Sequence, residues 1–209
     1  MWAIGNSSSM PATVDGLRLR PATLHDAELL ADIGARTFRD TFGPENKAED
    51  IEAHLAEAYT AVRFRREIGR TDYAHIIAEV NGVSAGFAVM CVHPAPPCVA
   101  AERPVELLRF YLERDWHGKG IAQTLMDAAV AEAQRRGGDV LWLGVWERNP
   151  RAIRFYEKVG FRDVGSQTFQ LGRDLQRDRV LARGLRLPGS DQAASPGSTV
   201  TREAASASK

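Results

Sequence analysis

Two segments about thirty residues apart carry the residue types best suited to chemistry. The first, residues 112–122, reads LERDWHGKGIA and places Gly118 and Gly120 directly before a predicted helix. Glycines leave the backbone N–H groups of a strand-to-helix turn open, and the helix dipole adds about half a positive charge there. A diphosphate needs such converging donors without intervening side chains. The turn is therefore a candidate phosphate-binding site, although a Gly-x-Gly turn alone also fits a purely structural turn.

A dinucleotide-binding turn fits this segment poorly. No third glycine completes the G-x-G-x-x-G pattern, and no early βαβ unit surrounds the turn.

The second segment, residues 141–161, reads LWLGVWERNPRAIRFYEKVGF and predicts a strand followed by a helix over residues 150–159. Asn149 is a favourable N-cap, and Gly160 ends the helix. Tyr156 shares a helix face with apolar residues, so its spacing alone fits a tyrosine at the rim of the core. The same side chain could instead present its hydroxyl to a ligand.

Together the two segments resemble the acyl-CoA motif pair of the GCN5-related N-acetyltransferases (GNAT family), and the resemblance spans residues 16–187. The family's phosphate pattern, Arg/Gln-x-x-Gly-x-Gly/Ala, falls on residues 117–122. This sequence departs from it at His117, because histidine near neutral pH is less charged than arginine. The resemblance implies acetyl-CoA as cosubstrate, with its diphosphate held by His117, Gly118, Lys119, Gly120, Ile121 and Ala122.

The resemblance also implies roles for other residues. Main-chain groups of Phe110 and Leu112 would bind the pantetheine arm, Asn149 would contact it, and the Tyr156 hydroxyl would act as the acid beside the thioester sulfur. The reaction in this family is direct attack by an amine in a ternary complex, without an acyl-enzyme. An amine with a pKa near 10.4 must first lose a proton. Glu106 is the candidate base, and its alternative is an ordinary strand-edge carboxylate.

A closer resemblance concerns the acceptor. Residues 37–42 (TFRDTF), residues 141–147 and the ending with Phe169, Gly172 and Asp178 are similar to bacterial spermidine/spermine N-acetyltransferases. That similarity implies a polyamine acceptor. The acidic stretch 45–57 is either a solvated helix face or a rim that attracts a cationic amine.

Two alternatives stay open for the function. One is acetylation of protein or peptide amino groups, and the other is a non-catalytic acyl-CoA-binding regulatory module.

Composition narrows the remaining classes. The 209 residues carry 27 basic and 27 acidic side chains, and this balance disfavours nucleic acid as a partner. Cys91, Cys98 and the scattered histidines lack metal-ligand spacing, so we expect no metal and a reduced, cytoplasmic protein. No apolar run approaches the ~20 residues that span a bilayer, and no membrane association is expected. A homodimer is left open.

The pattern along the chain predicts one α/β domain over residues 16–187, between a flexible arm (1–15) and a disordered tail (188–209). The resemblance implies the GNAT fold: a mixed, mostly antiparallel central sheet with helices on both faces and splayed central strands. The apolar periodicity and the turn residues predict strands at 16–21, 73–80, 83–92, 105–112, 140–146, 162–171 and 177–187, and helices after Thr23, through 51–62, at 121–136 and at 150–159.

Overall fold

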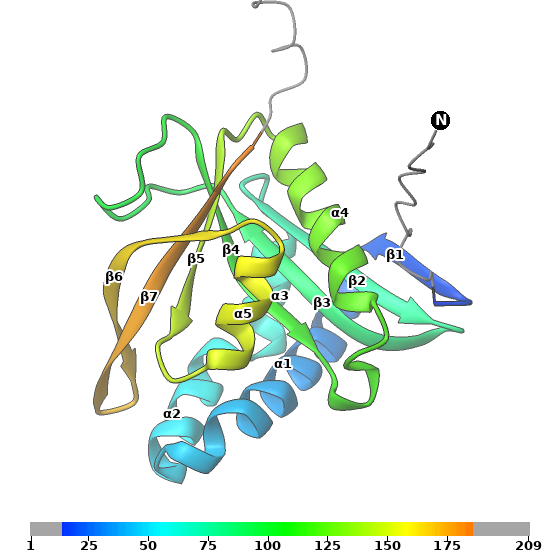
Figure 1. Cartoon of the computed structure of the whole chain (residues 1–209). Helices are drawn as coiled ribbons and strands as arrows, with labels where there is room; N and C mark the ends of the chain where they lie inside the picture. Colours follow the sequence, from blue (N-terminus) through cyan, green and yellow to red (C-terminus); the bar gives the residue numbers. More distant parts are fainter. Residues whose placement is uncertain (1–13, 186–209) are drawn as a thin grey trace, which may run out of the picture.

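The chain is described here by a computed structural model that covers residues 14–185 (Figure 1). Apart from residues 14 and 15, the predicted arm and tail lie outside the described residues. Seven strands form one sheet in the order β1-β2-β3-β4-β5-β7-β6. The strands are β1 (Leu17–Pro21), β2 (Tyr73–Val80), β3 (Val83–Cys91), β4 (Pro104–Leu112), β5 (Val140–Trp146), β6 (Arg162–Leu171) and β7 (Asp174–Gly184).

Helices cover both faces of the sheet, as the sequence predicts (Figure 1). The α-helices are α1 (Ala27–Phe42), α2 (Ala48–Ala58), α3 (Ala61–Ile68), α4 (Ile121–Arg135) and α5 (Pro150–Lys158). One apolar core joins α4 and α5 to the sheet, and the other joins α1, α2 and α3 to the opposite face. None of the helices described in residues 14–185 is long and apolar enough to span a membrane.

The β2–β3 turn shows how local sequence sets this framework. Asn81 and Gly82 both adopt positive φ, 52° and 80°, which a type I′ turn requires. The turn fixes the register in which Val80 lies opposite Val83. The strands predicted at 73–80 and 83–92 therefore form a hairpin.

The centre of the sheet opens between β4 and β5. These two strands are parallel, and they pair over only three positions, the last of which joins Glu106 to Trp142. Beyond that point β4 continues to Leu112 and β5 to Trp146 without pairing with each other. A bulge at Leu108 adds one residue to β4 relative to β3 and increases the local bend. The expected splay of the central strands is confirmed.

One predicted element is wrong. The apolar spacing through residues 51–62 predicts one continuous helical region, but the chain breaks at Tyr59 and Thr60 into α2 and α3. Thr60 starts α3 as an N-cap, because its hydroxyl accepts a hydrogen bond from the Arg63 N–H. Val62 consequently points outward, with 65% of its surface exposed.

Candidate active site

A cavity of about 740 Å³ opens where β4 and β5 diverge. One part, here called the turn half, is lined by the end of β4, the turn of residues 117–122 and α5. The other part, the hairpin half, is lined by Gly144 and Trp146 of β5, the β6–β7 hairpin and the α1–α2 region. Eight predicted site residues line the cavity: Glu106, Phe110, Leu112, His117, Gly118, Ala122, Asn149 and Tyr156.

The 117–122 turn presents free donors. Gly118 and Gly120 take φ values of 76° and 83°, which glycine adopts most easily. Residues 118–122 donate no N–H hydrogen bond to any group within the described part of the chain. Successive open N–H groups at the start of α4 make an anion-binding concavity.

Three predicted members of this turn do not present their side chains to the cavity. Ile121 is fully buried in the core, and the Lys119 ammonium lies 4.7 Å from the centre of the Trp116 ring. Gly120 does not line the cavity either. Ile121 and Gly120 therefore have only main-chain groups to offer.

His117 has a contact that the sequence did not reveal. Its Nε2 lies 2.8 Å from the Leu112 carbonyl oxygen, so Nε2 carries the hydrogen and donates it. This bond ties the turn to the end of β4. The predicted contact of His117 with phosphate would therefore have to use the other ring nitrogen, Nδ1.

Helix α5 places Asn149 and Tyr156 on the turn half. The Asn149 side chain accepts the Ala152 N–H at 3.1 Å, so the predicted N-cap is confirmed. The Tyr156 ring packs edge-on against Phe110, Phe155 and Phe161. Its hydroxyl has no hydrogen bond within residues 14–185, and the residue lines the cavity. Ring packing thus fixes the orientation while the hydroxyl stays available.

Two further tyrosines lie deeper in the cavity. The hydroxyls of Tyr59 and Tyr111 are 2.5 Å apart and share a hydrogen bond. Burial raises the pKa of Tyr59, Tyr111 and Tyr156 above the ordinary value, and the neighbouring Tyr111 adds to the effect on Tyr156. All three are neutral hydroxyls at physiological pH.

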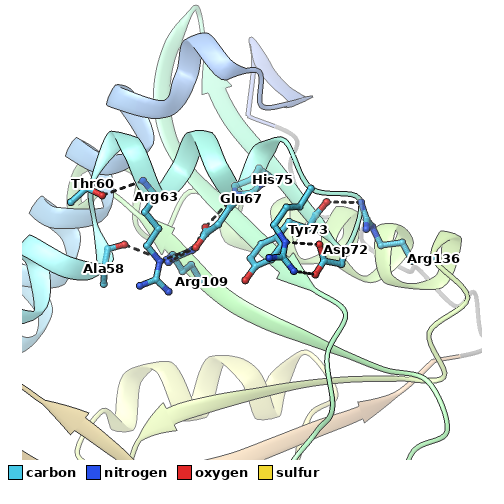
Figure 2. A network of polar contacts seen from close by, with 10 residues as sticks. Ala58, Thr60, Arg63, Glu67, Asp72, Tyr73, His75, Arg109 and Arg136 are labelled. Carbon is cyan, nitrogen blue, oxygen red and sulfur yellow. Dashed lines mark hydrogen bonds and ion pairs between the residues drawn. The ribbon is translucent and has the colours of Figure 1, made fainter.

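A buried ion pair joins Arg109 to Glu67 (Figure 2), and the Arg109 guanidinium lies 5.7 Å from the centre of the Tyr59 ring. Arg109 of β4 donates to both carboxylate oxygens of Glu67 on α3, at 2.7 and 3.2 Å, and Arg63 donates at 2.9 Å. Burial opposes ionisation of Glu67, but His75, Arg109 and Arg63 together outweigh it and lower the pKa of Glu67 to about 2. The His75 contact is the longest of the three, with Nε2 3.6 Å from the Glu67 carboxylate. The Arg109 charge is therefore neutralised within the protein.

Asp178 of β7 is a cavity residue to which the sequence assigned no role. It is 9% exposed, and its carboxylate has no hydrogen bond or ion pair to any described residue. Burial, aided by Glu147, raises the pKa of Asp178 to about 6. An aspartate on a strand with many polar residues gives no sequence signal for a functional site. Only the pairing of β7 with β5, which sets Asp178 opposite Trp146, brings it into the cavity.

Glu106 lies where the β4–β5 pairing ends, and its carboxylate is already engaged. His93 Nε2 contacts Glu106 Oε2, and the Cys91 thiol lies 3.7 Å from the same oxygen. The ligand atoms of Cys91, His93 and Glu106 lie within 4.8 Å of one another, a grouping that the sequence spacing did not indicate. Burial and Glu106 raise the pKa of Cys91 to about 12, so the thiol stays protonated.

Two acids of the stretch 45–57 are engaged by other residues of the described chain. Asp50 accepts the Arg173 N–H at 2.7 Å, and Glu52 pairs with Arg39 on the surface. Of this stretch, Glu45 and His54 line the cavity. Of the acids in this stretch, only Glu45 therefore presents a carboxylate to the cavity.

Comparison with known proteins agrees with this geometry. Residues 35–161 match the model of the acetyltransferase (GNAT) family. An uncharacterized N-acetyltransferase of Mycobacterium tuberculosis is 35% identical over 164 residues, which cover 77% of this chain and 98% of that protein. The chain therefore belongs to the GNAT family and is an acetyl-CoA-dependent N-acetyltransferase.

Two solved structures show the same fold. The PaiA N-acetyltransferase of Thermoplasma acidophilum, in complex with coenzyme A, superposes with a TM-score of 0.65 at 22% identity, over 80% of this chain and 98% of that one. The ribosomal-protein-S18-alanine N-acetyltransferase of Escherichia coli gives a TM-score of 0.57 at 17% identity, over 85% of this chain and 99% of that one.

Proposed function

We propose that the chain transfers the acetyl group of acetyl-CoA to a primary amine of a polyamine, such as spermidine or spermine, by direct attack in a ternary complex. The observation that carries this proposal is the single cavity that joins the open N–H groups of the 117–122 turn to the unpaired Asp178 carboxylate. Tyr156 also lines this cavity, with an unpaired hydroxyl. Acetyl-CoA is an anion and a polyamine is a cation. The turn half offers N–H groups to the anion, and the hairpin half offers the Asp178 carboxylate to the cation.

The cofactor would occupy the turn half. The diphosphate would accept hydrogen bonds from the N–H groups of residues 118–122, and the pantetheine arm would run along the unpaired edge of β4 past Phe110 and Leu112. Arg114, Arg148 and Arg151 line the same half and would face the cofactor's phosphates. The Leu112 carbonyl already accepts the His117 hydrogen bond, which holds this edge in place.

Tyr156 would stabilise the leaving thiolate. A free thiol has a pKa near 8.5 and a free tyrosine about 10, so full proton transfer is uphill by roughly 2 kcal/mol before burial is considered. Burial raises the pKa of Tyr156 further. A neutral hydroxyl that donates a strong hydrogen bond to the developing charge is therefore the role that fits best.

The amine must lose a proton before attack. Glu106 stays the proposal from the sequence, and it would act through a bridging water because His93 and Cys91 already contact its Oε2. Its position at the point where β4 and β5 separate supports this role.

The alternative acceptor is a protein or peptide amino group. It is favoured by the likeness of the fold to the acetyltransferase of Escherichia coli whose name gives a ribosomal-protein alanine as its target. A non-catalytic acyl-CoA-binding module would have no use for the unpaired Tyr156 hydroxyl.

An acceptor screen tests the proposal. Thiol release from acetyl-CoA would be followed with polyamines, peptides with free N-termini and aminoglycosides, and products would be identified by mass spectrometry. We expect release with spermidine or spermine and a product that carries one added acetyl group. Release only with peptides would favour the alternative acceptor, and none with any amine would contradict the proposed function.

A further inference from the structure

The Asp178 carboxylate is buried without a counter-charge. Within residues 14–185 it accepts no hydrogen bond and pairs with no cation, although it lines the cavity. Burying an ionised carboxylate alone costs several kcal/mol, so buried acids in folded proteins are normally paired. An unpaired acid in a cavity indicates that its partner is a ligand.

The space beside Asp178 is made by the absence of a side chain. Gly144 of β5 faces Asp178 and Gln167, and an added Cβ at Gly144 would lie 3.2 Å from Asp178 Oδ2 and 2.7 Å from Gln167 Nε2. Gln167 and Asp178 are directly paired across β6 and β7. The carboxylate oxygens and the Gln167 side-chain amide, which can turn its oxygen inward, thus converge on one pocket. Oxygen acceptors around a small space suit the three hydrogens of an ammonium group.

The charged groups around this pocket leave Asp178 without compensation. Tyr111 faces it from β4 as a neutral hydroxyl, and Glu147, which follows β5 and pairs with Arg177 at 4.0 Å, adds negative charge. From the helices, Asp40, Glu45, His54 and Arg63 line the same cavity, but Arg63 donates to Glu67. Arg109 is likewise held by Glu67. Arg63 and Arg109 are therefore engaged elsewhere, and Arg148, which also lines the cavity, forms no ion pair with Asp178 within the described residues.

We propose that Asp178 binds the ammonium group of the acceptor and accepts its proton, so that the neutral amine attacks the thioester. This inference rests on the proposed function and names the acceptor subsite within it. In this inference Asp178, in place of Glu106, is the base that takes the proton of the amine, and it contacts the reacting nitrogen directly.

The ammonium carries three protons, one of which passes to the Asp178 carboxylate. The nitrogen lone pair forms the C–N bond, and the C–S bond breaks with its electrons on sulfur. A second proton leaves the nitrogen for the sulfur, with Tyr156 stabilising the thiolate until it arrives, and the third stays on the amide product. Asp178 then releases its proton to solvent.

The environment of Asp178 suits this step. Burial raises the pKa of Asp178 from 3.8 to about 6, which makes proton transfer from an ammonium about a hundredfold less unfavourable than transfer to an ordinary aspartate. The acid must be ionised to bind the ammonium. In the free enzyme kcat/KM should therefore rise with pH through about 6.

The kinetic test is Asp178→Asn, which keeps the shape and removes the charge. We expect kcat/KM for spermidine to fall at least about a hundredfold with the dissociation constant of CoA unchanged. The rise in kcat/KM near pH 6 should disappear. The matched control is Asp163→Asn on the same hairpin, where the side chain pairs with Arg179 on the surface. The control should keep wild-type kinetics. A variant Asp178→Asn with wild-type kcat/KM and the wild-type pH profile would overturn the inference.

A binding test does not depend on turnover. Because the folded-state pKa of Asp178 is raised, its charge destabilises the fold fully above about pH 6 and not at all below about 3.8. Asp178→Asn should therefore have a higher melting temperature than wild type at neutral pH. Near pH 3.8 the two melting temperatures should be equal. Spermidine added with CoA should raise the melting temperature of wild type and not of the variant.

The two failures are distinguishable. Absence of thiol release by wild type with every amine would contradict the proposed function. A spermidine-dependent stabilisation that Asp178→Asn abolishes would even then support the ammonium site. Equal stabilisation of both proteins, or of neither, would overturn the site.

Discussion

The two halves of the cavity are built in different ways. The turn half uses main-chain N–H groups of residues 118–122 and one helix, α5, which begins about thirty residues later. The hairpin half assembles Gly144, Gln167 and Asp178 from three strands, and residues of α1 and α2 line the same half. The first half needs glycines at fixed spacing, and the second needs a correct sheet register. A sequence pattern can therefore reveal the first half far more readily than the second.

The halves also differ in charge. The elements of the turn half bring Arg114, Arg148 and Arg151 to the cavity, whereas the hairpin half brings Glu45 and Asp178. Opposite charges at the two ends would keep an anionic cofactor and a cationic amine each in its own half. If the halves act separately, a substitution in one half should leave binding in the other unchanged.

The largest effect in the turn half is expected from Tyr156→Phe. The ring and its packing stay, and only the unpaired hydroxyl is lost. We expect kcat to fall roughly 10²-fold while the dissociation constant of CoA hardly changes, because the hydroxyl acts on the leaving thiolate. Steady-state kinetics and calorimetry measure the two quantities. A wild-type kcat would remove Tyr156 from the chemistry and leave it a packing residue.

Much of the fold could be predicted from the sequence because its signals are local. The Asn81–Gly82 turn, the glycines before α4 and the Asn149 cap each act within a few residues. The break between α2 and α3 could not, because the apolar spacing continues through it. That break places Tyr59 where its hydroxyl meets Tyr111, a contact between residues far apart in the chain.

The candidate site likewise contains residues that the sequence could predict and residues that it could not. His117, Asn149 and Tyr156 lie in contiguous motifs that predicted them as site residues, and all three line the cavity. Asp178 was seen only as part of a resemblance, because its chemical setting depends on strand pairing with β5 and β6. The His117 bond to the Leu112 carbonyl was missed for a related reason, since it needs the turn to fold back on β4.

The next largest effect is expected from Gly118→Ala. Gly118 has a φ of 76° and open space around it, so an added methyl group would strain the turn and point into the cavity. We expect CoA to bind about tenfold more weakly, in line with 1–2 kcal/mol of left-handed strain and lost contact. Gly82→Ala is the matched control, because Gly82 has a φ of 80° and equally open space at the distant β2–β3 turn. Equal CoA affinity in both variants would place the diphosphate elsewhere.

A smaller effect is expected from Gly144→Ala in the hairpin half. The methyl group would displace Gln167 and crowd Asp178, so the KM for the amine should rise several-fold, up to about tenfold, while CoA affinity stays the same. Gly184→Ala, at an open position near the end of β7, is the control. Weaker CoA binding in Gly144→Ala would show that the two halves are not separable.

The smallest effect is expected from salt. Glu45 is the only acid of the stretch 45–57 that lines the cavity, so Asp40, Glu45 and Asp178 carry most of the attraction for a cationic acceptor. Raising the salt concentration from about 0.1 M to 1 M shortens the screening length from about 10 to 3 Å. The KM for spermidine should then rise only about two- to fivefold. A KM independent of salt would indicate an uncharged acceptor or a peptide bound by other contacts.

The most direct measurement is a crystal structure with a bisubstrate analogue, in which the sulfur of CoA is linked through an acetyl group to a primary amine of spermidine. We expect diphosphate oxygens within hydrogen-bonding distance of the N–H groups of residues 118–122. We also expect the linked nitrogen beside the Asp178 carboxylate over Gly144. A nitrogen placed against Glu106 and His93, or a diphosphate bound away from the turn, would contradict the proposed arrangement.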